Sequence, residues 1–314
     1  MKKLFILSGG VGSEREVSLL SGRNVVDTLR SEGVICEEII VEKDRSFVYK
    51  DLVMNESVGL EFLQKENALV LQLIHGTYGE DGELVKKLEE HAIAYIGTNS
   101  TVLEKTLNKY NAEVFFKECS ILTTESLLIR RGDSLLGLST LVYPVVIKPN
   151  KEGSSIGVTK AKNIEEVLDF VGKSLGSFSE VLVQKCIAGR EFTCGVVEID
   201  GVAVALVPSE VVLPEGMTFD YHAKYFVNGL EITPAVTDDE TTKKIQDLAL
   251  RVHNVIGCKG YSRTDMMMNE VGDLVVLEIN TVPGMTKVSF IPAEMKASGY
   301  LLKDFISGMI KKYS

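Results

Sequence analysis

The chain has 314 residues, of which 45% are apolar, and a formal net charge of −10 at pH 7. A chain of this length can bury more than one core, so two or three domains are expected. The negative charge argues against a nucleic-acid partner, because such binders gain affinity by neutralising phosphates, and any phosphate-bearing substrate would need locally placed positive charge.

The first residues and the cysteines lead us to expect an intracellular protein. The first apolar run, from Leu4 to Leu7, is too short for an export signal or a membrane span, so a cytoplasmic protein without a membrane partner is expected. The five cysteines include no Cys-x-x-Cys pair. Such a scattered, odd set is typical of reduced thiols and not of disulfides or structural zinc.

Residues 1–97 alternate strand and helix signals. Residues 3–8, 34–41 and 68–74 predict strands, and residues 14–30 predict an amphipathic helix, which together indicate a small parallel Rossmann-like α/β domain. Glycine-rich turns follow the first and third strands, where ligands gather in such domains. The glycine spacing of the first turn does not match Gly-x-Gly-x-x-Gly, so no dinucleotide site is expected.

A second domain is expected over residues 98–183. Residues 100–119 predict one helix, and residues 141–148 predict a strand that ends in Lys148. The polar, glycine-containing loop at 151–157 then leads into another strand. Backbone N–H groups and hydroxyls of such a loop can cover a triphosphate, although a plain hairpin loop is the commoner case.

A third, mostly antiparallel domain is expected over residues 184–314. The segment 208–234 is rich in glycine, proline and polar residues, which is typical of a lid or binding loop. Residues 239–256 and 292–313 each predict an amphipathic helix.

The strongest site signal is a predicted hairpin formed by residues 264–268 and 274–279. With the turn centred between Val271 and Gly272, Asp265 faces Glu278, and alternation puts Asn280 on the same face. Such oxygen donors suit Mg²⁺, and a cation would relieve the repulsion between the two acids. The alternative, two solvated surface acids, is equally open from these residues alone.

Two neighbouring features favour the metal site. Arg263 lies two residues before Asp265, so it shares a strand face with that acid and brings a permanent positive charge. The turn at 281–286, with Pro283 before Gly284, leaves backbone N–H groups able to stabilise an oxyanion.

Four motifs, taken in order, resemble those of the D-alanine–D-alanine ligases, and the similarity spans nearly the whole chain. They are Gly9-Gly10 with Glu14-Arg15-Glu16-Val17-Ser18, His75-Gly76 with Gly79-Glu80-Asp81-Gly82, Lys148 with Glu152-Gly153-Ser154-Ser155, and Glu278-x-Asn280-Thr281 with Pro283-Gly284-Met285-Thr286. The resemblance implies a three-domain α/β ATP-grasp fold. It also implies that ATP activates one D-alanine as an acyl phosphate, which the amino group of a second D-alanine attacks to give the dipeptide for peptidoglycan precursors.

The same resemblance implies roles for individual residues. Those expected to act in catalysis are Glu14, Ser154, Tyr225, Arg263 and Gly284, and those expected to contact the amino acids are His75, Ser289 and Phe290. Those expected to bind ATP are Lys105, Lys148, Gly153, Ser155, Gln184, Ile187, Glu191 and Lys224. Two Mg²⁺ or Mn²⁺ ions are expected on Asp265, Glu278 and Asn280. Homodimers are common in the family, but no contact surface can be identified from one sequence.

Some of these roles have alternatives. His75 can instead satisfy buried polar groups. Gln184 stands where the family usually has a glutamate that accepts from the adenine amino group; its carbonyl oxygen can also accept, but without charge, so weaker nucleotide affinity is expected.

The identity of the second substrate is the main open question. Tyr225 favours the dipeptide, because the relatives that form D-lactate esters tend to carry histidine in that role, whereas one hydroxyl is too small a difference to exclude D-serine. Another ATP-grasp carboxylate–amine ligase is a further alternative. A non-catalytic nucleotide sensor is disfavoured because the groups expected to act in catalysis are present.

Overall fold

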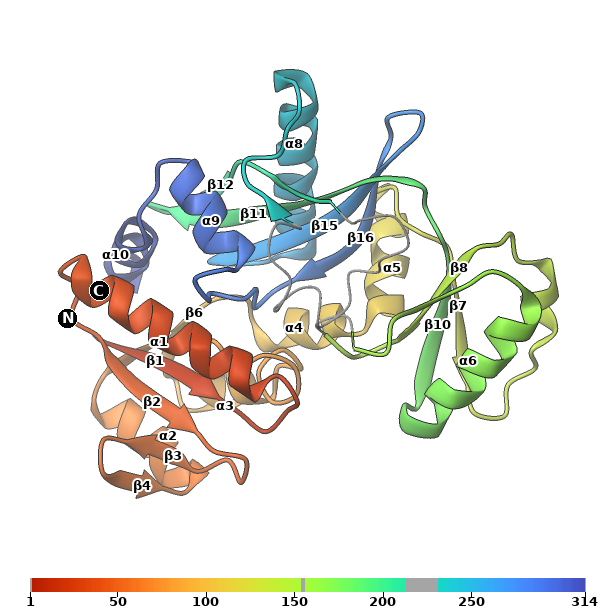
Figure 1. The fold of residues 1–314 in the computed structure, drawn as a ribbon. Coiled ribbons are helices and arrows are strands. Elements are labelled where there is room, and N and C mark those ends of the chain that lie inside the picture. Colours follow the sequence, from red (N-terminus) through yellow and green to blue (C-terminus); the bar gives the residue numbers. More distant parts are fainter. Residues whose placement is uncertain (1, 154–155, 213–230, 314) are drawn as a thin grey trace.

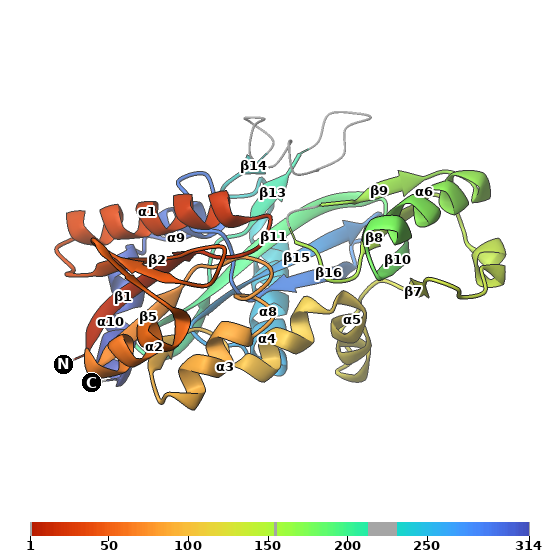
Figure 2. The same ribbon diagram turned by 90° about the horizontal axis from the view of Figure 1, so that it is seen from below.

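The computed structural model describes residues 2–153, 156–212 and 231–313, and these fold into three sheets flanked by helices (Figure 1). The predicted α/β class is confirmed. Both views place the N-terminal sheet at one end of the molecule, the middle sheet at the other and the third sheet between them (Figures 1 and 2). The domain boundaries after residues 97 and 183 stay predictions.

The N-terminal sheet has six strands in the order β4-β3-β2-β1-β5-β6. Its strands are β1 (Lys3–Gly9), β2 (Glu37–Val41), β3 (Phe47–Tyr49), β4 (Leu52–Met54), β5 (Ala68–Gln72) and β6 (Ala94–Ile96). The pairs that β1 and β5 make are parallel, as predicted, but β3 and β4 add an antiparallel edge, so the sheet is mixed. The connections to these two short strands are too short for a parallel crossover.

Three helices belong to this part of the chain: α1 (Arg15–Ser31), α2 (Glu56–Lys65) and α3 (Glu83–Glu90). The turn between β1 and α1 needs glycine, because Gly9 has φ +95° and an added Cβ would lie 2.4 Å from the carbonyl oxygen of Val41. After this turn, α1 buries apolar residues against the sheet. The helix begins at the edge of the sheet where β1 and β5 end.

The predicted helix over residues 100–119 is wrong in one respect, because it is broken into α4 (Ser100–Leu107) and α5 (Lys109–Glu118). Asn108 lies between them and caps α5 by accepting from the backbone N–H of Asn111. Asn150 stabilises the break between the two helices. Its backbone carbonyl oxygen accepts from the N–H of Lys109, and its side-chain amide donates to the side chain of Asn108. The break turns Lys109 toward the site described below.

The middle sheet has the strand order β7-β10-β8-β9. Its elements are β7 (Ser126–Arg130), a 3₁₀ helix (Leu136–Thr140), β8 (Val145–Pro149), β9 (Thr159–Ala161), α6 (Ile164–Ser177) and β10 (Glu180–Lys185). The antiparallel pair β8–β9 confirms that the glycine-containing loop joins two strands. Helix α6 packs on this sheet and forms a separate core with it.

The third sheet is antiparallel, with the order β14-β13-β11-β15-β16 and β12 paired with β11. Its strands are β11 (Gly189–Ile199), β12 (Val202–Ala205), β13 (Ser209–Val211), β14 (Glu231–Ile232), β15 (Tyr261–Asn269) and β16 (Leu274–Asn280), and its helices are α8 (Asp239–Ile256), α9 (Phe290–Ala297) and α10 (Leu302–Tyr313). The last two were predicted as one helix. Gly299, at φ +80°, ends the first of them.

One apolar core joins the N-terminal sheet to α9 and α10, and in it the rings of Tyr261 and Phe305 lie 5.7 Å apart. This packing brings the turn after β16 against α1. Asn24 of α1 donates to the carbonyl oxygen of Met285 at 2.7 Å, and the hydroxyl of Ser21 accepts from the N–H of Met285. Within the described part of the chain, no helix combines the length and apolar character needed to cross a bilayer.

Candidate active site

The β15–β16 hairpin pairs Asp265 with Glu278, as predicted. The register shifts immediately beyond this pair, where Met266 faces Val276 and Leu277 is the extra residue of a bulge. If the register of the pairs next to the turn continued without a bulge, Asp265 would lie opposite Leu277. The bulge therefore brings the two acids together, since a shift of one residue turns a side chain to the other face.

Asp265 is surrounded by hydrogen-bond donors. Arg263 binds it through two nitrogens, with Nε 2.7 Å from Oδ1 and an Nη 2.6 Å from Oδ2. Thr193 donates to Oδ1 at 2.6 Å, and the amide nitrogen of Asn280 donates to Oδ2 at 3.1 Å. Burial opposes the charge of Arg263, but Asp265 outweighs it and holds the pKa of the guanidinium above its ordinary value. The arginine is a fixed positive charge.

Arg263 also contacts the start of α9. Its guanidinium carbon lies 5.3 Å from the ring centroid of Phe290, a buried residue. One turn further, Glu294 is fully buried and accepts from the N–H of Gly195 at 2.6 Å and from Ser209 at 2.9 Å. Burial raises the pKa of Glu294 to about 8.

Two lysines face the other acid. The ammonium of Lys109 lies 3.4 Å from Glu278 and donates to the carbonyl oxygen of Glu152 at 2.8 Å. Lys148 is buried, and burial together with Lys109 lowers its pKa against the opposing effect of Glu278. The two acids thus already have cationic partners in the protein, so their mutual repulsion does not by itself demand a metal ion.

These groups line one pocket of about 330 Å³ between the middle and third sheets. It brings together ten of the predicted residues: Lys148, Gly153, Gln184, Ile187, Glu191, Arg263, Asp265, Glu278, Asn280 and Phe290. Lys105 is not among the described residues that line it, and its ammonium lies 3.2 Å from the ring centroid of Phe115. Sequence reasoning missed Lys109 and Thr193, which do line the pocket.

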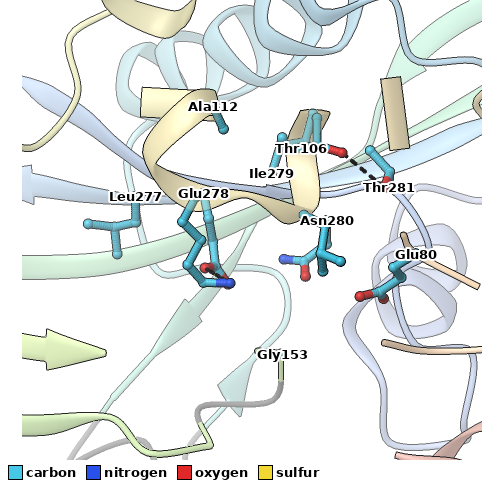
Figure 3. Close-up of a pocket in the computed structure, with 11 residues that line it drawn as sticks. Glu80, Thr106, Ala112, Gly153, Leu277, Glu278, Ile279, Asn280 and Thr281 are labelled. Atoms are coloured by element: carbon cyan, nitrogen blue, oxygen red, sulfur yellow. Dashed lines mark hydrogen bonds and ion pairs between the residues drawn. The ribbon is translucent and has the colours of Figure 1, made fainter. Parts of the chain in front are cut away.

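A smaller pocket of about 30 Å³ extends the site toward the N-terminal sheet (Figure 3). Figure 3 shows Glu278 and Asn280 projecting from β16 toward the side on which Gly153 lies, with Glu80 beyond Asn280 on the side away from Glu278. Glu80 was also missed, although it belongs to the same glycine-rich turn as His75. Its carboxylate lies 3.6 Å from Nδ1 of that histidine.

Glu14 reaches the same region from the start of α1, where it is buried. An added Cβ on Gly153 would lie 2.7 Å from its carboxylate, and one on Gly76 would lie 3.0 Å away. Both glycines thus allow Glu14 to contact two loops that are remote in sequence. The carboxylate links the N-terminal part of the chain to the loop between β8 and β9.

The remaining predicted residues surround the turn after β16. His75 bonds through Nδ1 to the carbonyl oxygen of Val282 at 3.0 Å, so it satisfies buried polar groups whether or not it also contacts a substrate. Ser289 accepts from the N–H of Thr286 at 3.0 Å, and an added Cβ on Gly284 would lie 2.8 Å from its hydroxyl oxygen. The predicted residues Ser154, Ser155, Lys224 and Tyr225 lie outside the described residues.

The oxygen atoms of Asp265, Glu278 and Asn280 are suitable ligands for Mg²⁺, provided that other groups complete its coordination shell. Within residues 2–153, 156–212 and 231–313, no cluster of three or more His, Cys, Asp or Glu side chains forms a ready-made metal site. Two carboxylates and the amide oxygen of Asn280 on one wall do suit an ion that completes its shell with phosphate oxygens and water.

Known proteins resemble the chain along its full length. A family profile described as "D-ala D-ala ligase C-terminus" matches residues 128–311. D-alanine–D-alanine ligases of Actinobacillus pleuropneumoniae serotype 5b and Halalkalibacterium halodurans are 33% and 34% identical, over 99% of this chain and 97% and 100% of theirs. The crystal structure of the VanG D-Ala:D-Ser ligase from Enterococcus faecalis superposes with a TM-score of 0.83 at 26% identity, covering 100% of this chain and 99% of that one.

Proposed function

The chain belongs to the D-alanine–D-alanine ligase family, and from this premise we propose that it joins two D-alanine molecules at the expense of ATP. The observation that carries the proposal is the convergence of Lys148, Lys109 and Arg263 on a pocket that also holds Asp265 and Glu278. Such an arrangement is suited to phosphoryl transfer, in which the protein mainly positions and neutralises charge.

In the first step, a carboxylate oxygen of one D-alanine attacks the γ-phosphorus of ATP. The bond from this phosphorus to the β-bridging oxygen breaks, which releases ADP and leaves a D-alanyl phosphate. Lys148 and Lys109, which both line the pocket, are proposed to bind the phosphates. Glu14 is proposed to pair with the ammonium of this D-alanine, with His75 near its carboxylate.

In the second step, the amino group of the other D-alanine attacks the acyl carbon. The tetrahedral centre then expels inorganic phosphate, and the amine loses a proton. Arg263 is held in place by Asp265 and Phe290, so it can stabilise the negative charge without reorienting. The N–H of Gly284 is proposed as a further donor, and Ser289 as the partner of the second carboxylate.

Mg²⁺ or Mn²⁺, as two ions, is proposed to bind with the nucleotide on Asp265, Glu278 and Asn280. The ions are needed because of the triphosphate: together with the two acids it carries more negative charge than the nearby lysines and Arg263 neutralise. When bound, the ions would neutralise the β- and γ-phosphates. Gln184, Ile187 and Glu191 are proposed to contact the base and ribose, with Gly153 and Ser155 covering the phosphates.

Water must be excluded while the acyl phosphate exists. We propose that Ser154, Tyr225 and Lys224 close over the reactants together with Glu14. A role for Lys105 in phosphate binding is kept as an alternative to Lys109. The enzyme is proposed to work in the cytoplasm, where its dipeptide would enter peptidoglycan precursors.

A second candidate substrate is D-serine, because one of the structural relatives is a D-Ala:D-Ser ligase at 26% identity. The two reactions differ by a single hydroxyl on the second substrate, so the same groups would serve both. D-Lactate would require the site to accept a hydroxyl nucleophile in place of an amine.

ADP release measured with a panel of D-alanine, D-serine, D-lactate and L-alanine tests the proposal. The expected result is release that needs D-alanine, a divalent cation and ATP, with the dipeptide as product and no turnover of L-alanine. Turnover with D-alanine plus D-serine exceeding that with D-alanine alone would favour the second candidate. Activity confined to L-amino acids would eliminate both.

A further inference from the structure

Gln184 lies in β10 with only 5% of its surface exposed, and its side chain reaches the pocket assigned above to ATP. Its amide has a donor end and an acceptor end of nearly equal size. Which end faces the pocket decides which bases can be recognised. The answer therefore depends on the groups behind the amide.

Two hydroxyls, Ser126 and Thr124, lie behind it, and both are within hydrogen-bond reach of the Gln184 amide nitrogen, Ser126 at 3.0 Å. A hydroxyl has one proton to donate. Ser126 donates its proton to the carboxylate of Glu113, which also accepts from the backbone N–H of Ser126 at 3.0 Å. The serine oxygen can then only accept from Gln184.

Glu113 is suited to fix this arrangement. It lies on α5 and is 4% exposed, and Lys117, one turn along the helix, donates to it at 2.8 Å. Thr124 also points its hydroxyl toward the same carboxylate, at 3.5 Å. If the Gln184 amide were reversed, its carbonyl oxygen would face two hydroxyl oxygens whose protons are directed to Glu113. The reversed amide would lose both hydrogen bonds and gain repulsion.

We propose that Glu113 is a positioning residue that acts through Ser126 and Thr124 to fix the Gln184 amide, so that its carbonyl oxygen selects a base carrying an exocyclic amino group. The inference rests on the proposed function in that the pocket binds a nucleotide. Adenine offers such an amino group at position six, whereas hypoxanthine and guanine carry a carbonyl oxygen there, which would face the Gln184 oxygen.

The test compares ATP with ITP at saturating D-alanine. Ser126→Ala removes one acceptor of the amide, and Glu113→Gln can donate to Ser126 and so free its proton for a reversed amide. Both variants are expected to lower the ATP-to-ITP ratio of kcat/KM at least tenfold, while the KM for D-alanine stays unchanged. The control, Lys117→Gln, removes a partner of Glu113 that is 47% exposed and should change the ratio less than twofold.

A second pair of variants isolates the amide. Gln184→Glu presents acceptor oxygens in either orientation, so adding Ser126→Ala to it should leave the ATP preference intact. The proposal would be overturned if Ser126→Ala and Glu113→Gln left the ATP-to-ITP ratio of kcat/KM unaltered. It would also be overturned if Ser126→Ala lowered this ratio as much in the Gln184→Glu protein as in the unmodified one.

Calorimetric binding of ATP and ITP to the same proteins separates this inference from the proposed function. If the chain binds ATP but forms no dipeptide, the ligase assignment fails while the binding ratios still test the amide. If the dipeptide forms and the variants bind both nucleotides as the unmodified chain does, the amide proposal alone fails. Melting temperatures of the variants provide the check on folding.

Discussion

Glu294 predicts an unusual dependence of stability on pH. It is fully buried in α9, accepts from the N–H of Gly195 and from Ser209, and burial raises its pKa from 4.5 to about 8. The unfolded chain releases this proton near pH 4.5, whereas the folded chain keeps it until about pH 8. Folding therefore retains a proton throughout this range, and the free energy of unfolding falls as the pH rises.

The size of the effect follows from the two pKa values. Between pH 5 and 7.5 the folded chain holds nearly one more proton than the unfolded chain, which changes the unfolding constant almost tenfold per pH unit. The loss over this interval is about 3 kcal/mol. The protonated acid donates to Ser209, whose hydroxyl can then donate to Thr233, 2.6 Å away. Glu294→Gln mimics this form, because its oxygen can accept from Gly195 and its nitrogen can donate to Ser209. The variant should lack this loss.

Urea unfolding of both proteins at pH 5.0, 6.0, 7.0 and 7.5 is the assay, since contributions of all other titrating groups cancel in the difference. We expect nearly equal stability at pH 5 and a variant more stable by about 3 kcal/mol at pH 7.5. A difference that is the same at every pH would refute the reasoning.

Three further predictions concern other groups. Burial lowers the pKa of His253 from 6.5 to about 4, so the folded chain resists protonation and loses stability as the pH falls through this range. In urea unfolding, His253→Gln should lose less stability between pH 6.5 and 4 than the unmodified chain does. An equal loss in both proteins would contradict this prediction. Lys109→Met should raise the KM for ATP at least tenfold and Lys105→Met less than threefold; the reverse order would restore Lys105 as the phosphate ligand. Glu278→Gln should raise the Mg²⁺ concentration needed for half-maximal ADP release at least tenfold with an unchanged melting temperature, and unaltered metal dependence would remove Glu278 from the metal site.

The sequence predicts the parts of the site that depend on local patterns. The pairing of Asp265 with Glu278 was correct, but the turn centre from which it was predicted was not, because Met268 pairs with Leu274 and the turn is therefore centred on Val271. The pairing also depended on a bulge at Leu277, which no local signal indicated. The β3–β4 edge and the end of α9 at Gly299 were missed because short strands and single glycines carry weak signals.

The rest depends on contacts between remote segments. The break at Asn108 is held by Asn150, which lies 42 residues away in sequence, so the helical pattern alone could not show that Lys109 would turn into the pocket. The same applies to charge: Arg263 and Lys109 compensate the two acids, whereas the sequence alone indicated acids in need of a metal. The two asparagines inside the predicted helix, Asn108 and Asn111, were the local signal of a break, but they do not say where it falls.

Transfer of oxygen from substrate to phosphate tests the central claim most directly. D-Alanine labelled with ¹⁸O in its carboxylate is incubated with ATP and Mg²⁺, and the inorganic phosphate is analysed by mass spectrometry. Because the carboxylate oxygen that attacks the γ-phosphorus leaves with the phosphate, the account predicts one ¹⁸O atom in each phosphate released along with D-alanyl-D-alanine. Unlabelled phosphate accompanying dipeptide formation would contradict an acyl phosphate in this pocket.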